Sequence, residues 1–337
     1  MRVDFVTMTY YGPPTRGLIA AIDRCIAVGP LKHPPLRGPP QALITPGADN
    51  ARDFRVATWN VWFSEYKQDE RHGALLGEVF AQAPDVICLQ EVTDKLHEAM
   101  LRSTRVSAAY VATEPEFLPS LDGYDVSIWV RNGIDIRRCW TINILSDMQR
   151  RCLVTDLSVP DANRPQALSV RVATVHLESY ETNASVRSGQ LAAIIPRLKS
   201  ERFPNGKVPD VVILAGDFNF CSSWRSENAQ LEEDEDIRDV WQSLRPDDLG
   251  YTEDTCINRM MEERQSGSKK QVRFDRVIAL KPSASEEAQG ASIDEPTEVA
   301  PVHVSLLGTA PLPGSPSVWP SDHFGLVADF RAWVRMT

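Results

Sequence analysis

The residues with the clearest capacity for chemistry follow the apolar run 211–215, where Gly216, Asp217, Phe218 and Asn219 come next. Five apolar, largely β-branched residues are too few for an ordinary helix and predict a buried strand that ends in a tight turn. Asp217 and Asn219 then project together at the carboxyl end of this strand. A carboxylate that accepts a proton beside an amide that holds an oxygen suits hydrolysis of a phosphate ester. The same residues could form only an Asx turn, so the pattern needs support from other segments.

Other predicted strands also end in, or closely border, polar residues of compatible chemistry. Strand ends on one rim of a sandwich can converge although they lie far apart in the sequence. Five such ends are hard to explain by solvent exposure alone, and together they predict one site. The residues that join Asp217 and Asn219 in this set are Asn60, Glu91, His176, Asp322 and His323.

The acidic and amide side chains suit a metal-assisted hydrolysis. Glu91 follows an apolar strand and is a suitable oxygen ligand for Mg²⁺, with Mn²⁺ as an alternative ion. Asp217 would deprotonate the attacking water. Asn60 and Asn219 would hold the phosphate or a metal-bound water.

The histidines suit contact with the phosphate. His323 can donate to a phosphate oxygen as negative charge builds, and Asp275 can fix its tautomer and keep it charged. His176 would be a second donor, with Ser179 near it. Because a single His or strand-end Glu is more often structural, the assignment depends on the whole set.

Composition limits the possible partners and compartment. The formal net charge of -10 argues against a protein that coats nucleic acid, but not against one that takes a single phosphorylated end into a local pocket. The six cysteines are scattered, without a CxxC pair or a zinc spacing, which suits a reducing compartment. No apolar run reaches membrane-spanning length, and residues 1–15 lack the apolar core of a signal peptide. We therefore expect a soluble intracellular protein without membrane contact. Separately, we expect a monomer in the nucleus or the cytoplasm.

The chain divides into an N-terminal extension, residues 1–53, and a catalytic domain, residues 54–335. In the extension, residues 17–28 predict a short helix, and prolines between positions 30 and 46 exclude regular structure after it. This helix could pack on the domain, bind a partner or belong to a targeting segment, and packing is the default. Residues 281–301, rich in Ser, Ala, Glu and Pro, predict a disordered insertion within the domain.

Apolar periodicity predicts alternating strands and helices in the domain. Thr93 is expected to cap the helix that follows it. The expected helices cover residues 71–83, 94–102, 184–200 and, in a short form, 239–241. The expected strands cover 54–60, 85–90, 124–131, a meander over 134–159, 167–176, 211–215, 271–280, 303–307 and 326–330.

The polar strand ends belong to six short motifs, which are Thr-Trp-Asn, Leu-Gln-Glu, Thr-Val-His-Leu, Gly-Asp-Phe-Asn, Phe-Asp-Arg and Ser-Asp-His. In this order, over residues 54–331, they resemble the endonuclease/exonuclease/phosphatase superfamily. The resemblance implies an α/β fold, a four-layer α/β sandwich of two mixed β-sheets flanked by helices, and a divalent-metal phosphodiesterase or phosphatase. By position it implies Glu91 as the metal ligand, Asp217 as the general base, Asp275 and His323 as a pair, and Asn60, His176, Asn219 and Asp322 as the rest of the site.

Within the superfamily, the chain is most similar to the plant and fungal form of type 2 tyrosyl-DNA phosphodiesterases. The shared stretches include Asn-Val-Trp-Phe, His-Leu-Glu-Ser, Asp-Val-Trp, Tyr-Thr and Arg-Phe-Asp-Arg. The similarity implies a role in DNA repair, with a DNA 5′ end that bears a tyrosyl adduct from topoisomerase II as the substrate. It implies substrate contacts by Ser179, Tyr251 and Arg276. A phenol with a pKa of about 10 leaves with little protonation, which suits this chemistry.

Three positions depart from the vertebrate enzymes. Trp62 stands in place of an Asp, Cys221 in place of an Arg, and Glu253 in place of a Trp. The last two replace contacts to the substrate strand, so they affect the grip on DNA more than the phosphodiester chemistry.

The alternatives are other enzymes of the superfamily and a protein without catalysis. Phe220 and Cys221 replace the Ser and Pro usual in RNA deadenylases, and Phe274 replaces the Cys that precedes the Asp of phosphoinositide phosphatases. A sphingomyelinase lacks support because there is no secretion signal or membrane helix. A binding scaffold would be expected to lose Glu91, Asp217 or His323, and all three are present.

Overall fold

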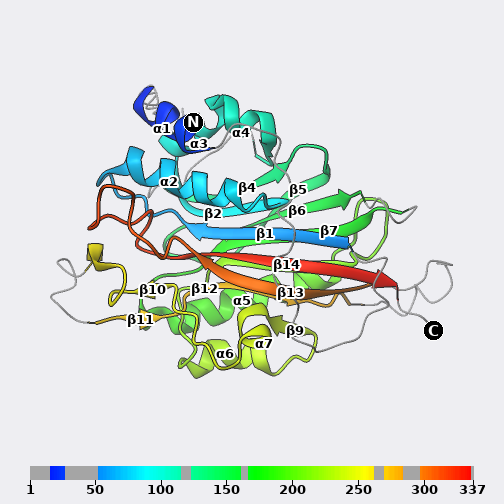
Figure 1. Cartoon of the computed structure of the whole chain (residues 1–337). Helices are drawn as coiled ribbons and strands as arrows, with labels where there is room; N and C mark the ends of the chain where they lie inside the picture. The colour runs from blue at the N-terminus through cyan, green and yellow to red at the C-terminus, as the bar shows by residue number, and fades with distance from the viewer. Residues whose placement is uncertain are drawn as a thin grey trace, which may run out of the picture.

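The fold is that of a computed structural model, which describes residues 16–26, 52–114, 123–160, 166–261, 269–283 and 297–334. In these residues two six-stranded mixed sheets pack face to face, with helices on both outer faces (Figure 1). The expected four-layer α/β sandwich is therefore confirmed.

The first sheet has the strand order β13-β14-β1-β2-β4-β3, and only its β1–β2 pair is parallel. β14 lies between β1 and β13, so the last strand in the described residues is internal to the sheet. The bounds are β1 Arg52–Asn60, β2 Val86–Thr93, β3 Tyr110–Ala112, β4 Tyr124–Arg131, β13 Thr297–Leu307 and β14 Gly325–Val334.

The second sheet has the order β5-β6-β7-β8-β12-β9, and only its β7–β8 pair is parallel. The chain crosses from β1 to β2 and from β7 to β8 through helices, as a parallel connection requires. The bounds are β5 Asp135–Asn143, β6 Arg151–Val159, β7 Leu168–His176, β8 Val211–Asp217, β9 Ile237–Asp239 and β12 Asp275–Leu280, with a separate pair β10 Glu253–Asp254 and β11 Gln271–Val272.

Burial on both faces explains the continuous apolar run of β8. Val211 and Ile213 face the core between the two sheets, whereas Val212 and Leu214 face the helices. Residues at alternate positions of a strand point to opposite faces. In β8 the odd-numbered residues therefore face the space between the sheets, and the even-numbered residues face the helices. Asp217 therefore continues the row that faces the space between the sheets.

Helices cover the two outer faces, α1 to α4 over the first sheet and α5 and α6 over the second (Figure 1). Thr93 caps α3 as expected, because its Oγ1 accepts a hydrogen bond from the Leu96 amide at 3.3 Å. The short α7 packs against β12 and β13. The bounds are α1 Arg16–Cys25, α2 Gln68–Ala81, α3 Asp94–Arg102, α4 Thr104–Ala109, α5 Ala184–Ser200, α6 Arg225–Glu232 and α7 Val240–Leu244, with 3-10 turns at Glu181–Asn183 and Arg259–Met261.

The helix expected near the N-terminus forms as α1 and packs on α2. Leu18 and Ile22 are fully buried in the same core as the inner face of α2. The two helices approach closely because α2 presents glycines: a Cβ at Gly77 would lie 2.7 Å from the Cys25 carbonyl oxygen. Packing is thus the observed arrangement for this helix, and prolines 30 to 46 lie outside the described residues.

Some expected boundaries are wrong. β13 begins at Thr297, so residues 297–301 are strand rather than part of the expected disordered insertion, and residues 284–296 lie outside the described part. The single strand expected over 271–280 is two strands, because β11 pairs with β10 whereas β12 pairs with β8. In the described ranges, no helix is both long and apolar enough to cross a membrane.

A buried histidine in α2 makes the stability of the fold depend on pH. Burial, and then the neighbouring Arg71 cation, lowers the pKa of His72 to about 3. In the unfolded chain the imidazole of His72 takes up a proton near pH 6.5, whereas in the folded chain it stays neutral until the pH falls much lower. The contribution of His72 to the free energy of unfolding is therefore complete above pH 6.5. It falls by about 1.4 kcal/mol per pH unit as the pH drops toward 3.

We expect His72→Gln to weaken this pH dependence, because the amide can donate to the Val61 carbonyl, 3.2 Å from the His72 Nε2, without titrating. The measurement is urea unfolding of both proteins at pH 7.5 and pH 5. The wild type should lose more free energy of unfolding between these values than the variant. Equal losses would mean that His72 does not contribute.

Candidate active site

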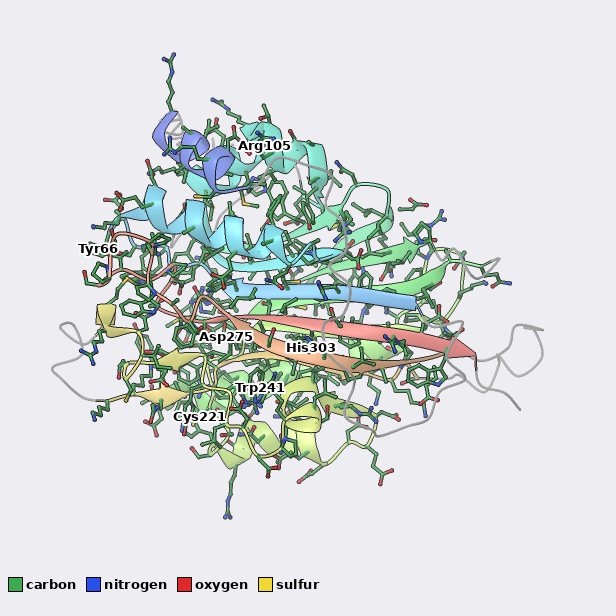
Figure 2. All side chains as sticks on the ribbon, viewed as in Figure 1. Tyr66, Arg105, Cys221, Trp241, Asp275 and His303 are labelled. Carbon is green, nitrogen blue, oxygen red and sulfur yellow. The ribbon has the colours of Figure 1, made fainter. Side chains whose placement is uncertain are left out.

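Four polar side chains meet where strands of the two sheets end. His176 on β7 and Asp275 on β12 are each paired in register with Asp217 on β8. Asn60 reaches them from the other sheet, and its Nδ2 donates to Asp217 Oδ2 at 3.0 Å. His176 Nε2 lies 3.5 Å from the same oxygen. Figure 2 labels Asp275 in this region. The expected convergence of strand ends is thus present.

A β-bulge directs Glu91 into this cluster. The β2–β4 register shifts between Leu89 and Val92, and Glu91 has a φ of 59°. Without the bulge, strict alternation would turn this side chain toward the helices. Glu91 Oε1 accepts from Asn60 Nδ2 at 3.3 Å, and Oε2 accepts from the Phe63 amide at 3.0 Å. The left-handed backbone therefore serves to position a carboxylate.

The turn after β8 fixes both oxygens of Asp217. Gly216 has a φ of 142°, and a Cβ there would overlap the Val175 carbonyl oxygen, so only glycine fits. Asn219 adopts a φ of 54° and its amide donates to Asp217 Oδ1 at 2.9 Å. Its side-chain Nδ2 donates to the Leu177 carbonyl at 2.9 Å. Asn219 thus orients Asp217 and ties the turn to β7.

His323 is held by Asp275 and by the loop that carries it. Its Nδ1 lies 2.8 Å from Asp275 Oδ2, and the Asp275 amide donates to Thr252 Oγ1 at 3.1 Å. Ser321, two residues earlier, donates to the Asn60 carbonyl at 2.6 Å. The Ser-Asp-His loop is therefore joined directly to the end of β1.

Neighbouring charges set the protonation of the central groups in opposite directions. Burial alone would lower the pKa of His323, but Asp275 and other carboxylates outweigh it and raise that pKa well above 6.5. Burial and then the Arg150 cation lower the pKa of His176 to about 3. Burial would raise the pKa of Asp217, but the charge on His323 and the hydrogen bonds from Asn60 and the Asn219 amide outweigh it and lower that pKa. The cluster thus combines a charged His323, a neutral His176 and an ionised Asp217.

The expected substrate role of Arg276 does not hold. Arg276 follows Asp275 on β12, so its side chain points to the opposite face of the sheet. It is buried, and its guanidinium donates to Asp239 Oδ2 at 2.8 Å and to Asn228 Oδ1 at 3.1 Å. It is a structural residue between the sheet and α6. Tyr251 is half-buried in the turn before β10.

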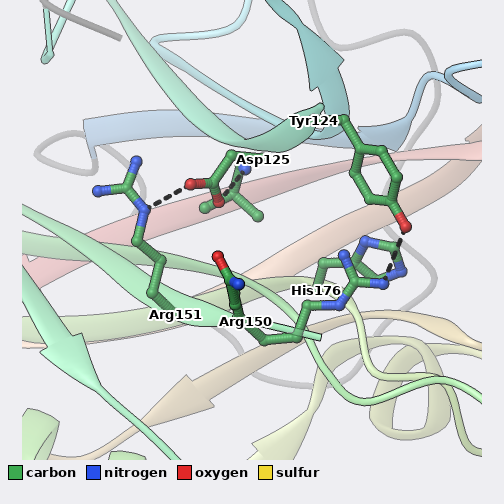
Figure 3. A pocket seen from close by; sticks show the side chains of 7 residues that line it. Tyr124, Asp125, Arg150, Arg151 and His176 are labelled. Atoms are coloured by element: carbon green, nitrogen blue, oxygen red, sulfur yellow. Dashed lines mark hydrogen bonds and ion pairs between the residues drawn. The ribbon is translucent and has the colours of Figure 1, made fainter. Parts of the chain in front are cut away.

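An aromatic wall with a buried cation adjoins His176, and the sequence did not indicate it. Arg150 is 7% exposed and donates to the Tyr124 hydroxyl at 3.2 Å (Figure 3). Phe63, 45% exposed, stacks on Tyr124 with ring centroids 4.6 Å apart. Arg150 also lies 3.4 Å from the expected substrate contact Ser179. Because Arg150 lies in a meander without a motif, only the exposed Phe63 of Asn-Val-Trp-Phe could have pointed here.

The cluster fits a divalent cation. Burial and then the Asp322 carboxylate raise the pKa of Glu91 to about 7, and burial, with the Glu253 carboxylate, raises that of Asp322 to about 6. Asp275 Oδ1 is buried without a hydrogen-bond partner in the described part of the chain. Donor atoms of Asp217, Asp275 and His323 lie within 4.8 Å of one another, and Nδ1 of His323 pairs with Asp275. Mg²⁺ prefers oxygen, so Glu91 is the better candidate ligand.

The fold and this cluster define a hydrolase of phosphate esters. Residues 57–323 match the model of the Endonuclease/Exonuclease/phosphatase family, and the chain belongs to this family. Its enzymes typically depend on a divalent metal ion. The comparison with curated protein sequences gives no match.

Solved structures of several family members share the fold. Zebrafish TDP2 in complex with a single-strand DNA product has a TM-score of 0.65 at 22% identity, over 82% of this chain and 98% of that one. Truncated TDP2 of Caenorhabditis elegans has a TM-score of 0.61 at 20% identity, over 82% and 97%. The human Nocturnin catalytic domain has a TM-score of 0.56 at 20% identity, over 82% and 93%. At these identities the similarity shows the fold and leaves the substrate open.

Proposed function

We propose that this protein is a Mg²⁺-dependent phosphodiesterase that hydrolyses 5′-phosphotyrosyl bonds at DNA ends, and so acts in DNA repair as a monomer in the nucleus or cytoplasm. The observation that carries the proposal is the aromatic wall of Phe63 and Tyr124, which adjoins His176 and holds the Arg150 cation. An aromatic leaving group or an unstacked base fits such a wall better than an aliphatic alcohol does.

In this proposal the central residues divide the work of an in-line hydrolysis. Asp217, ionised and held by Asn60, takes a proton from the attacking water. His323, charged and oriented by Asp275, donates a hydrogen bond to a phosphate oxygen as negative charge builds there. His176, which is neutral, supplies a second donor.

Glu91 would hold the divalent ion, with Asp322 close by, and Mn²⁺ is an alternative to Mg²⁺. When bound, the ion supplies positive charge that stabilises the phosphate in the transition state. A phenolate leaves with a pKa of about 10, so the site needs no strong acid for the leaving group.

The grip on the DNA strand would differ from that of vertebrate relatives. Glu253, where a Trp was expected from resemblance, is buried and forms an ion pair with Lys270, whose Nζ lies 4.7 Å from the Phe274 ring centre. Cys221 is also buried. Neither residue offers an exposed stacking surface or a cation. We therefore expect binding to depend mainly on contacts with the few nucleotides nearest the 5′ end.

Selectivity tests the proposal. We expect faster hydrolysis of 5′-tyrosyl DNA than of an abasic duplex, poly(A) or a phosphoinositide at one salt concentration and one Mg²⁺ concentration. The reason is that the aromatic wall favours an aromatic leaving group, whereas the net charge of -10 opposes a long duplex. Faster cleavage of poly(A) would instead favour an RNA-directed enzyme. Faster release of phosphate from the phosphoinositide would favour a phosphoinositide phosphatase.

A further inference from the structure

The segment between β5 and β6 carries Arg150 to the active site without an apolar core of its own. Leu145 is 84% exposed, and Asp147 and Gln149 are exposed as well. Gln149 also has a left-handed φ of 56°. Arg150, by contrast, is buried beside His176. A segment that buries so little apolar surface needs polar contacts to hold one conformation.

Those contacts come from Glu178, whose side chain is fully buried. Its Oε1 accepts hydrogen bonds from the amides of Asp147 and Met148, both at 3.1 Å. Its Oε2 accepts from Ser146 Oγ at 2.6 Å and from Gln190 Nε2 at 3.3 Å. Both oxygens of Glu178 are thus used, three times by the segment and once by α5.

Ser146 passes this restraint on to Arg150. While its hydroxyl donates to Glu178, its oxygen accepts from the amides of Met148 at 3.1 Å and Arg150 at 2.8 Å. Glu178 is itself fixed, because its amide donates to Gln190 Oε1 at 3.0 Å and its carbonyl accepts from Arg187 Nη1 at 3.0 Å. A continuous chain of hydrogen bonds therefore joins α5 to the backbone of Arg150.

We infer that Glu178 and Ser146 are positioning residues, which hold Arg150 where its guanidinium meets the substrate phosphate beside His176. The inference rests on the proposed phosphodiesterase function. Arg150 Nε is buried without a hydrogen-bond partner among the described residues, so the side chain retains a donor for a ligand. A carboxylate is needed at Glu178 because an amide there has one acceptor oxygen and would turn its NH₂ toward two donors.

Hydrogen exchange tests the restraint without a substrate. In the full-length protein, Glu178→Gln and Ser146→Ala should each speed exchange of the amides of Asp147, Met148 and Arg150 by about tenfold or more. Ser146→Thr keeps the hydroxyl and should restore slow exchange. Asp329→Asn changes another buried carboxylate, paired with Arg55 in the other sheet, and controls for general loss of stability. Unchanged exchange in Glu178→Gln overturns the inference.

Binding of a 5′-phosphorylated oligonucleotide tests the link to Arg150. Arg150→Ala and Glu178→Gln should each raise its Kd by about tenfold, and the double variant should bind no more weakly than Arg150→Ala alone. If the two effects multiply, or if the wild type does not bind this probe, Glu178 does not act through a phosphate contact of Arg150. This assay measures binding and not hydrolysis of tyrosyl DNA, so a failure of this inference can be told apart from a failure of the proposed selectivity.

Discussion

Asp217→Asn is expected to lower turnover of a 5′-tyrosyl oligonucleotide by about 10²–10⁴-fold, the usual effect of removing a general base. Asparagine has nearly the same shape and can still accept from the Asn219 amide, which lies 2.9 Å from Asp217 Oδ1. It cannot accept a proton from water. The fold should therefore persist while the reaction slows, as measured by single-turnover rates at saturating Mg²⁺.

The control for this change lies at the other end of the same strand. Asp210 precedes β8, and its Oδ2 accepts from the Ser169 amide at 2.7 Å, a bond that an asparagine oxygen can replace. Asp210→Asn should leave the rate within about twofold of the wild type. A loss below tenfold in Asp217→Asn, with chemistry rate-limiting in the wild type, would remove Asp217 from the role of base.

Glu91→Gln is expected to abolish most Mg²⁺-dependent activity and to leave the fold intact. The side-chain oxygen of glutamine can still accept the hydrogen bond that the backbone N–H of Phe63 donates to Glu91 Oε2 at 3.0 Å. The loop after β1 therefore keeps its place. The substitution removes the negative charge of the side chain that the β2 bulge turns toward Asn60, and so weakens binding of the metal ion. Since even changes around metal ligands cost about 10–100-fold, we expect a loss above about 10²-fold.

The measurement is the rate as a function of Mg²⁺ concentration, together with thermal unfolding. Glu98→Gln, half-buried on α3 beside Arg102 and outside the site, is the matched control and should match the wild type in the Mg²⁺ dependence of its rate. A Glu91→Gln protein that reaches the wild-type rate at the same Mg²⁺ concentration would show that another group holds the metal.

The layers and the convergence of the site could be predicted because local signals agree with the global fold. Thr93 before an apolar helix, and the β-branched run that ends at Gly216, each determine their own element through short-range contacts. Once strands alternate, the even or odd position of Asp217 decides which face it reaches. The face of the sheet that Asn60, His176, Asp217 and Asp275 occupy follows from this rule.

Other features depend on contacts between distant segments. The bulge at Glu91 arises from a register shift against β4, and the Leu-Gln-Glu motif does not predict it. The resemblance implies a substrate contact for Arg276, but strand alternation turns its side chain away from Asp275 and toward Asp239. Arg150 has no motif, since its position depends on Glu178, 28 residues further along the chain. Loop geometry of this kind is decided by tertiary hydrogen bonds.

The internal position of β14 has a consequence for how the chain becomes active during synthesis. β14 is made after every other described element, yet β1 and β13 both pair with it. The Ser-Asp-His loop, which carries His323, comes directly before it. A ribosome-bound chain that lacks this strand thus has an open sheet edge and no His323 loop fixed against β1. A nascent chain can therefore fix His323 against β1 only after β14 has emerged from the ribosome, so we expect a product truncated before β14 to be inactive.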